Sequence, residues 1–266
     1  MKDKLILITG STDGIGKQTA VELALMGAQI IVHGRNKERV NLSVQEVQKV
    51  SNNKNISGFT ADFSSLKHLR SSLNELKSKL DKIDVLINNA GVYMSSRILS
   101  EDGYEMTFAV NHLAHFLLTN ELFPQIQKSK NGRIINVSSM THLSGVLDFN
   151  NLNAEKNFNP YGSYCLSKLA NVLFSRELAN RLDGTGITSN SLHPGVIGTK
   201  LLHAAFKARG DSVKKGAETS VHLASSPTVS TISGKYFVDK KIAAHHPIAD
   251  DGAILKKFWE VSKNMI

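Results

Sequence analysis

Residues 4–16 read KLILITGSTDGIG, and this stretch decides the fold. Its first half is an almost uninterrupted apolar run, which predicts a strand buried on both faces of a parallel sheet. Its second half is a glycine-rich turn, and the helical pattern that follows stops at Gly27. A strand, a glycine turn and a helix in this order form an anion site, because the backbone can approach a pyrophosphate and the first amides of the helix face it. The alternative interpretation is a purely structural turn.

The composition is that of an ordinary folded protein, with 266 residues, 41% of them hydrophobic and 21% charged. We find no linker, repeat or low-complexity block, so we expect one domain over residues 1–266. No apolar run approaches the ~18 residues that span a bilayer, and the first apolar run is too short for a signal peptide. The single cysteine, Cys165, allows no intrachain disulfide and indicates a reducing cytoplasm.

The net charge of +9 is scattered through every segment of the chain. Nucleic-acid binding is one interpretation of this charge, and a basic surface that tolerates an anionic small molecule is the other. No basic tract alternates with aromatic residues, so we favour the small molecule and expect no nucleic-acid partner.

Apolar runs alternate with helical patterns along the chain, which predicts an α/β protein. We expect a single-domain Rossmann-type doubly wound parallel β-sheet of about seven strands, flanked by helices on both faces. The expected strands are 4–9, 29–33, 56–61, 83–87, 133–137, 187–192 and 234–238. The expected helices follow the glycine turn and lie within 36–55, at 64–80, at about 104–127 and from near Tyr161.

The end of the second expected strand indicates the type of cofactor. In a dinucleotide fold this position carries an acid for the ribose 2′-hydroxyl or a base for the 2′-phosphate. Here Arg35 follows the strand directly, and no acidic residue comes before Glu38. A guanidinium can bind a phosphate with two hydrogen bonds, so the sequence favours NADP(H) over NAD(H).

Tyr164 and Lys168 lie four residues apart in an expected helix, so their side chains share one face. The ordinary pKa of a phenol is about 10, too high for proton transfer near neutral pH. An ammonium about 4 Å away would stabilise the phenolate by roughly 4 kcal/mol at an effective dielectric constant of about 20, and would bring that pKa close to working pH. The pair therefore predicts a general acid/base, with a chance pair on a surface helix as the alternative.

The glycine spacing Thr-Gly-x-x-x-Gly-x-Gly at 9–16 resembles the signature of the short-chain dehydrogenase/reductase family. Four further motifs follow in the family's order, and the resemblance runs from about Lys4 to Trp259. They are Asn-Asn-Ala-Gly at 88–91, Phe-Ala-Val-Asn-His-Leu at 108–113, the serine pair that ends the strand at 133–137, and Tyr-x-x-x-Lys at 164–168. The similarity is greatest to the branch that includes retinol dehydrogenases and related carbonyl reductases, since the chain also has Leu-His-Pro-Gly-Val at 192–196.

The resemblance implies hydride transfer between a nicotinamide cofactor and a carbonyl or alcohol substrate. Tyr164 would be the proton donor, and Lys168 would lower its pKa and bind the nicotinamide ribose. Ser139 would orient the carbonyl, with Ser138 as the alternative. Asn111 would interrupt the helix expected at about 104–127 and hold a water in the proton path.

The resemblance also implies the cofactor contacts. Asp62 would contact the adenine, although it can also be the N-cap of the helix that begins near Ser64. Asp13 stands before the second glycine, where many NADP-using members have a base. We expect the cofactor-binding residues to be Gly10, Ser11, Thr12, Asp13, Gly14, Ile15, Gly16, Arg35, Asn36, Asp62, Phe63, Asn89, Ala90, Gly91, Tyr164, Lys168, Pro194, Gly195, Val196 and Thr199.

Two segments, 141–160 and 196–212, are expected to cover the substrate pocket. His112 and His115 are spaced too sparsely for a metal site, so we expect packing and no metal. The family commonly forms homodimers or homotetramers. Two other functions stay open: a non-catalytic NADP(H) sensor on the same fold, and a sugar-nucleotide epimerase, which shares Tyr-x-x-x-Lys.

Overall fold

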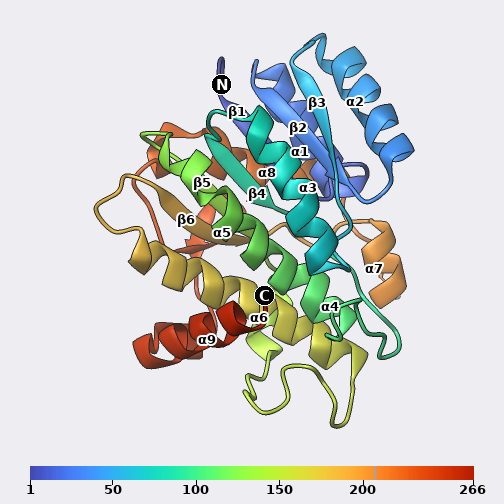
Figure 1. The fold of residues 1–266 in the computed structure, drawn as a ribbon, viewed down its shortest axis with the longest axis vertical. Coiled ribbons are helices and arrows are strands. Elements are labelled where there is room, and N and C mark those ends of the chain that lie inside the picture. The colour runs from blue at the N-terminus through green and yellow to red at the C-terminus, as the bar shows by residue number, and fades with distance from the viewer. Residues whose placement is uncertain (207) are drawn as a thin grey trace.

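Eight strands form one sheet in the order β3-β2-β1-β4-β5-β6-β7-β8 (Figure 1). The computed structural model describes residues 1–206 and 208–266. The first seven strands are parallel, and only β8 is antiparallel to its neighbour. The strands are β1 Leu5–Ile8, β2 Gln29–Gly34, β3 Ile56–Thr60, β4 Val85–Asn88, β5 Arg133–Val137, β6 Thr188–His193, β7 Tyr236–Val238 and β8 Lys241–Ala243. The expected doubly wound α/β fold is confirmed.

Helices cover both faces of this sheet. Figure 1 shows α3, α5 and α6 in front of it and α1 and α8 behind it, with α9 beside α6. The helices are α1 Gly14–Leu25, α2 Lys37–Ser51, α3 Leu66–Lys79, α4 Met106–Phe108, α5 Ala114–Gln127, α6 Pro160–Arg181, α7 Lys200–Ala205, α8 Val213–Ser225 and α9 Gly252–Asn264. Within the described residues, none of them is long and apolar enough to cross a membrane.

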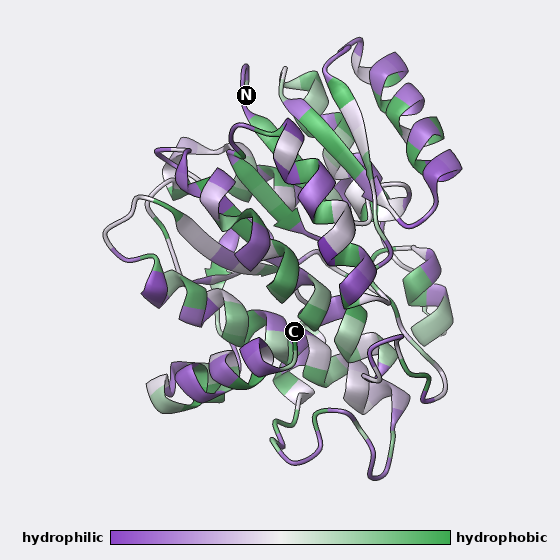
Figure 2. Ribbon diagram, in the orientation of Figure 1, coloured by the Kyte–Doolittle hydropathy of each residue, from purple (hydrophilic) through white to green (hydrophobic). Residues whose placement is uncertain are grey.

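The core consists of two layers, because successive side chains of a strand point to opposite faces. In β1, Leu7 packs into the layer of α3, α5 and α6, whereas Ile6 and Ile8 pack into the layer of α1 and α8. Figure 2 shows the matching pattern, with apolar strands at the centre and polar residues on the outer faces of α2 and α9. Burial on both sides explains why the sequences of β1 and β4 are almost continuous apolar runs.

The strand expected at 234–238 is present as β7, but it is not the last one, since the chain continues into β8. Asp239 and Lys240, with φ angles of 47° and 65°, form the turn between them. A two-residue hairpin turn with both central residues at positive φ is typically signalled by Asn-Gly or Asp-Gly. Asp-Lys lacks the glycine, so this hairpin has no clear signal in the sequence.

The expected helix at 104–127 is divided into α4, a π-helical segment Ala109–Leu113 and α5. Asn111 lies at the centre of the π-helical segment. Such segments place an extra residue in a helix and often occur at functional sites. The break at Asn111 agrees with the feature that the family resemblance implied.

Candidate functional site

A cleft of about 1300 Å³ lies along the carboxyl ends of the parallel strands. The chain builds the sheet outward from β1 to β3 in one direction and from β4 to β6 in the other, so the strand order reverses between β1 and β4. In open α/β sheets this switch point is where ligands bind. The cleft reaches from Arg35 at one end to Phe206 at the other.

The glycine turn after β1 lines the cleft and leaves no room for a side chain at Gly10 or Gly16. Gly10 has a φ of +62°, and a Cβ built on it would lie 2.8 Å from the Cα of Ala90. A Cβ on Gly16 would lie 2.4 Å from Asn89 Nδ2 and 2.5 Å from the Gly10 carbonyl oxygen. This close packing brings the Asn-Asn-Ala-Gly turn against the first turn of α1, so the two predicted motifs form one backbone cradle that fits a dinucleotide.

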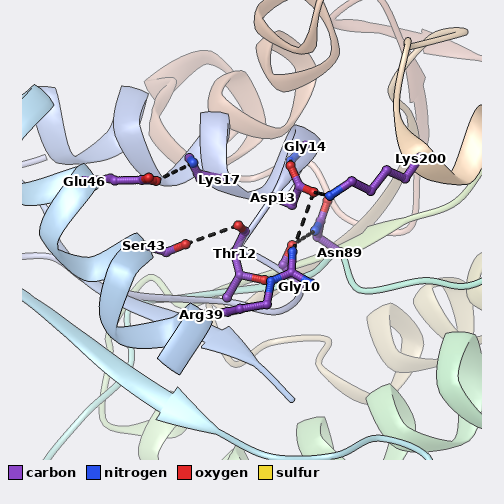
Figure 3. Close-up of polar contacts among 10 residues, drawn as sticks. All are labelled: Gly10, Thr12, Asp13, Gly14, Lys17, Arg39, Ser43, Glu46, Asn89 and Lys200. Carbon is purple, nitrogen blue, oxygen red and sulfur yellow. Dashed lines mark hydrogen bonds and ion pairs between the residues drawn. The ribbon is translucent and has the colours of Figure 1, made fainter. Parts of the chain in front are cut away.

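Charged side chains gather at the rim of the cleft near α1 (Figure 3). Asp13 is the N-cap of α1, and its carboxylate lies 2.6 Å from Lys200 Nζ and 3.7 Å from Arg39 Nη2. The hydrogen bond from Lys200 lowers the pKa of Asp13 below its ordinary value, so the carboxylate stays charged. Arg35 also lines the cleft, and it has no ion-pair partner within residues 1–206 and 208–266.

Arg39 and Lys200 were missed in the sequence interpretation. Arg39 lies in the first turn of α2, four residues after Arg35, and both residues line the cleft. That spacing could have been read from the sequence. The contact of Lys200 with Asp13 joins residues 187 positions apart and had no local signal.

The lining of the cleft also includes His33, Asp62 and Phe63. His33 stacks on Phe63 with a centroid distance of 4.3 Å, and its Nδ1 accepts a hydrogen bond from the Gly10 N–H. Burial lowers the pKa of His33 to about 4, so it stays neutral. Asp62 accepts hydrogen bonds from the N–H and hydroxyl of Ser64, whereas Ser65 is the N-cap of α3. The alternative N-cap role for Asp62 was therefore wrong.

Tyr164, Lys168 and Ser139 meet at the centre of the cleft. All three side chains are nearly inaccessible to solvent, at 6%, 3% and 9% exposure. Lys168 Nζ lies 5.5 Å from the centroid of the Tyr164 ring and donates a hydrogen bond of 3.2 Å to the Val137 carbonyl. The predicted i, i+4 face of α6 is therefore turned inward to the cleft, and the surface-helix alternative is excluded.

Of the two serines after β5, Ser138 is bound to the main chain of α6. Its hydroxyl donates to the carbonyl oxygen of Lys168 at 2.7 Å. The Ser139 hydroxyl accepts from the Thr141 N–H at 3.2 Å, and Ser139 caps a short 3-10 turn at Met140–Ser144. The Ser139 hydroxyl thus keeps its own hydrogen to donate into the cleft.

Burial has opposite effects on the two titratable groups of this set. It lowers the pKa of Lys168 to about 8, and it raises the pKa of Tyr164 well above its ordinary value, against a smaller lowering by Ser139. The direction for Tyr164 is opposite to the one expected from the Tyr-x-x-x-Lys spacing. The reason is that loss of solvent around the phenol outweighs an ammonium that lies beside the ring and is itself partly desolvated.

Asn111 lies just behind this set and is fully buried. Its side chain accepts from the Val92 N–H at 2.8 Å and donates to the Ser167 hydroxyl at 3.0 Å. A Cβ on Gly91 would be 3.4 Å from Asn111 Oδ1 and 3.6 Å from Lys168 Nζ. Gly91 is therefore the point at which the cofactor cradle and the catalytic candidates come together.

The far end of the cleft is apolar and aromatic. Tyr93 packs against Tyr164 and Phe206, with ring centroids 5.8 and 6.2 Å apart. The lining of the cleft also includes Met94, Ile98, Met106, Val110, Met140, Leu201 and Leu202. These apolar side chains, together with the Tyr93 ring that packs on Tyr164, make the cleft suitable for an apolar molecule.

The two predicted substrate segments contribute unequally. Val196 and α7 line the cleft, as does Phe206. Of 141–160, Thr141 lines it, whereas Asn153 accepts hydrogen bonds from the Arg97 guanidinium on its main-chain oxygen. Lys207 of the second segment lies outside the described residues.

Most predicted cofactor residues line the cleft, including Thr12, Ile15, Pro194 and Gly195. Ser11 and Asn36 do not. The Ser11 hydroxyl donates to the Ile8 carbonyl and accepts from the His33 N–H, and Asn36 is the N-cap of α2. Thr199 lines the cleft but also uses its hydroxyl to cap α7. Within the part of the chain that the structure describes, no cluster of His, Cys, Asp or Glu forms a metal site.

The sheet order, the glycine turn and the cleft at the switch point define a Rossmann-type dinucleotide-binding protein. The profile of the short chain dehydrogenase family matches residues 4–210. Human retinol dehydrogenase 13 is 38% identical over 99% of this chain and 84% of its own length. Mouse retinol dehydrogenase 14 is 38% identical over 100% of this chain and 86% of its own length. The chain belongs to the short-chain dehydrogenase/reductase family and is an oxidoreductase of the hydride-transfer type.

Solved structures agree on the fold. An uncharacterized protein from Mycobacterium paratuberculosis superposes with a TM-score of 0.83 at 27% identity, covering 99% of this chain and 93% of that one. A short chain dehydrogenase from Escherichia coli CFT073, solved with NADPH, has a TM-score of 0.74 at 22% identity, covering 89% and 96%. At that identity the likeness shows the shared fold alone.

Proposed function

We propose that this protein is an NADP(H)-dependent oxidoreductase that interconverts a carbonyl and an alcohol on an apolar substrate, with Tyr164 as general acid/base. The observation that carries the proposal is the inward-facing set of Tyr164, Lys168 and Ser139 at the centre of one continuous cleft. Arg35 and Arg39 at one end favour a 2′-phosphate, and the apolar walls at the other end favour a hydrophobic aldehyde, ketone or alcohol.

The residues divide the work by position. The cofactor supplies the hydride when bound, and a carbonyl carbon receives it. The Ser139 hydroxyl donates a hydrogen bond that orients the carbonyl oxygen, and Tyr164 donates its proton to that oxygen as negative charge develops. Lys168 supplies positive charge on the same side, which favours the tyrosinate left behind. In the alcohol-to-carbonyl direction the tyrosinate takes the proton back.

The cofactor choice also has a residue that opposes it. The Asp13 carboxylate stands beside the proposed phosphate site, but Lys200 and Arg39 pair with it in Figure 3. These cations offset its charge, so it does not by itself prevent a phosphate from binding between Arg35 and Arg39.

The decisive experiment follows NADPH oxidation against a panel of apolar aldehydes, ketones and quinones. Wild-type enzyme is expected to turn over at least one class, and Tyr164→Phe is expected to lose at least about 10²-fold in kcat while NADPH affinity stays within about twofold. Phenylalanine keeps the ring and removes only the hydroxyl. Full turnover by the variant would disprove the proton-donor role.

The same assay separates the competing functions. Tight NADPH binding with no turnover on any carbonyl would indicate a sensor, and conversion of a sugar nucleotide without net cofactor oxidation would indicate an epimerase. A cytoplasmic location and a homodimer or homotetramer stay predictions. They are tested by fractionation of the source cells and by light scattering of the purified chain.

A further inference from the structure

His115 is a buried histidine that the proposed mechanism does not use. It lies in the first turn of α5 with 1% of its surface exposed. Its Nδ1 is 3.0 Å from the main-chain oxygen of Asn111, and its Nε2 is 2.9 Å from the Thr9 hydroxyl. The ring therefore bridges the catalytic π-helical segment and the end of β1.

The partners of His115 determine which nitrogen carries the hydrogen. A carbonyl oxygen only accepts, so Nδ1 must donate to Asn111 and Nε2 must accept from the Thr9 hydroxyl. The Thr9 oxygen itself accepts from the N–H groups of Asn89 and Ala90, at 2.8 and 2.9 Å. The Ile87 carbonyl, at 3.4 Å, is the poorer acceptor for the same hydroxyl.

These bonds form one continuous path through the site. It begins at the two amides of the Asn-Asn-Ala-Gly turn, passes through Thr9 and His115, and ends at the Asn111 carbonyl. The side chain of Asn111 is held separately, by Val92 and Ser167. His115 thus links the main chain of Asn111 to the cofactor cradle, in addition to the contact that the Asn111 side chain makes with Val92.

Burial keeps this bridge in one protonation state. It lowers the pKa of His115 to about 3, against the hydrogen bond to Asn111 and with help from the positive charge of Lys168. The ring is neutral throughout the pH range in which the enzyme works, so its donor and acceptor do not exchange roles.

We propose that His115 is a positioning residue that sets the backbone of Asn111 relative to the Thr9-centred cofactor cradle, and so couples cofactor binding to catalytic alignment. The catalytic half of this inference rests on the proposed function. The coupling itself is a property of the folded chain and can be measured without turnover.

Three substitutions separate the two ends of the bridge. Asparagine places its amide near the position of Nδ1, and glutamine places its amide near the position of Nε2. His115→Asn is expected to keep kcat within about threefold and to weaken NADPH binding about tenfold, because only the Thr9 end is lost. His115→Gln is expected to lower kcat while NADPH binding stays nearly unchanged, because only the Asn111 end is lost. His115→Leu is expected to lower kcat, to weaken NADPH binding and to shift the pH at which kcat is half-maximal.

His112→Leu is the matched control. His112 is fully buried in the same π-helical segment, but its Nε2 is 2.9 Å from the Ser262 hydroxyl, away from the cleft. This variant is expected to lower Tm without changing NADPH affinity or the pH profile.

Amide hydrogen exchange of the protein without cofactor gives a readout independent of activity. His115→Leu is expected to speed exchange at Asn89 and Ala90, and His112→Leu is not. If the wild type turns over no carbonyl, the proposed function fails, but exchange and NADPH affinity still decide the coupling. The inference is overturned if His115→Leu only lowers Tm as the control does, or if the asparagine and glutamine variants lose kcat and affinity in equal proportion.

Discussion

Lys168 is held in the protein at a cost to stability. Its side chain is 3% exposed, and its Nζ donates a hydrogen bond to the Val137 carbonyl. Burial lowers its pKa from 10.5 to about 8, so at neutral pH the folded protein keeps a charged ammonium that water would solvate better. Such costs are typical of residues retained for function.

Replacement of Lys168 by methionine should therefore stabilise the protein while it abolishes activity. At pH 7 the free energy of unfolding is expected to rise by about 1–3 kcal/mol. The folded wild type binds fewer protons than the unfolded chain between pH 8 and 10.5, so its stability rises with pH in that window. The difference in free energy of unfolding between the variant and the wild type should therefore shrink as pH rises through that window. Urea unfolding at pH 7 and pH 10 measures both effects, and a variant less stable than wild type at pH 7 would contradict them.

At the scale of single residues, the sequence predicted which residues lie near the cleft better than it predicted what each side chain binds. Tyr164, Lys168 and Ser139 meet as expected. Asn36 and Ser11, in contrast, cap a helix and join two strands. Short polar side chains at a turn serve the backbone and a ligand equally well, so the sequence alone cannot tell the two uses apart.

At the scale of elements, the turn from β2 to α2 determines the cofactor end of the cleft. Arg35 follows β2 directly and Arg39 lies in the first turn of α2, and both line the cleft. Lys37 lies between them in the chain and is exposed, outside the cleft lining. The turn therefore presents two of its three neighbouring cations to the cleft.

This arrangement predicts a selective loss of NADPH affinity. Arg35→Ala and Arg39→Ala should each weaken NADPH binding about tenfold and leave NADH binding within about twofold, because NADH lacks the 2′-phosphate. Lys37→Ala should change neither. Titration of both cofactors by fluorescence measures this, and an equal loss for NADH and NADPH would place the phosphate elsewhere.

The interrupted helix at 106–127 shows the limit of periodicity at this scale. Its apolar spacing predicted one continuous helix, and the polar Asn111 was the one sign of a break. The π-helical segment forms because the Asn111 side chain binds Val92 and Ser167, which come from two other parts of the chain. Such tertiary contacts have no trace in a local pattern.

At the scale of the whole molecule, the candidate site and a stabilising buried carboxylate lie at opposite ends of the strands. The cleft lies at the carboxyl ends of the strands, and Asp84 lies just before β4, at the amino end. Asp84 is 2% exposed and accepts from Lys4, the Leu5 N–H and the Ser129 hydroxyl at 2.9–3.0 Å. Burial raises its pKa, but these hydrogen bonds outweigh burial and hold the pKa below its ordinary value.

Asp84→Asn should accordingly destabilise the fold without affecting the site. We expect a loss of roughly 2–4 kcal/mol at pH 7, because three donors lose a charged acceptor. The carboxylate contributes this stability above its unfolded pKa and loses it as pH falls through the lower folded value, so the difference should narrow below about pH 4. NADPH affinity should not change.

Chemical unfolding at several pH values, together with NADPH titration, tests this separation. Asp81→Asn is the control, since Asp81 pairs with Lys128 on an exposed surface and should have little measurable effect. A weakened NADPH affinity in the Asp84 variant would show that the two ends of the sheet are energetically coupled.

The sequence by itself determined the sheet, its switch point and the residues that meet in the cleft. A strand buried on both faces requires an apolar run, and a backbone cradle requires glycines. Each of these requirements acts within one short segment, so each is visible in the local sequence. Tertiary structure alone decided the pairing of Asp13 with Lys200, the π-helical break at Asn111 and the direction of the Tyr164 pKa. Each of these depends on which distant groups come close and how much water they exclude, and only the folded chain brings those groups together.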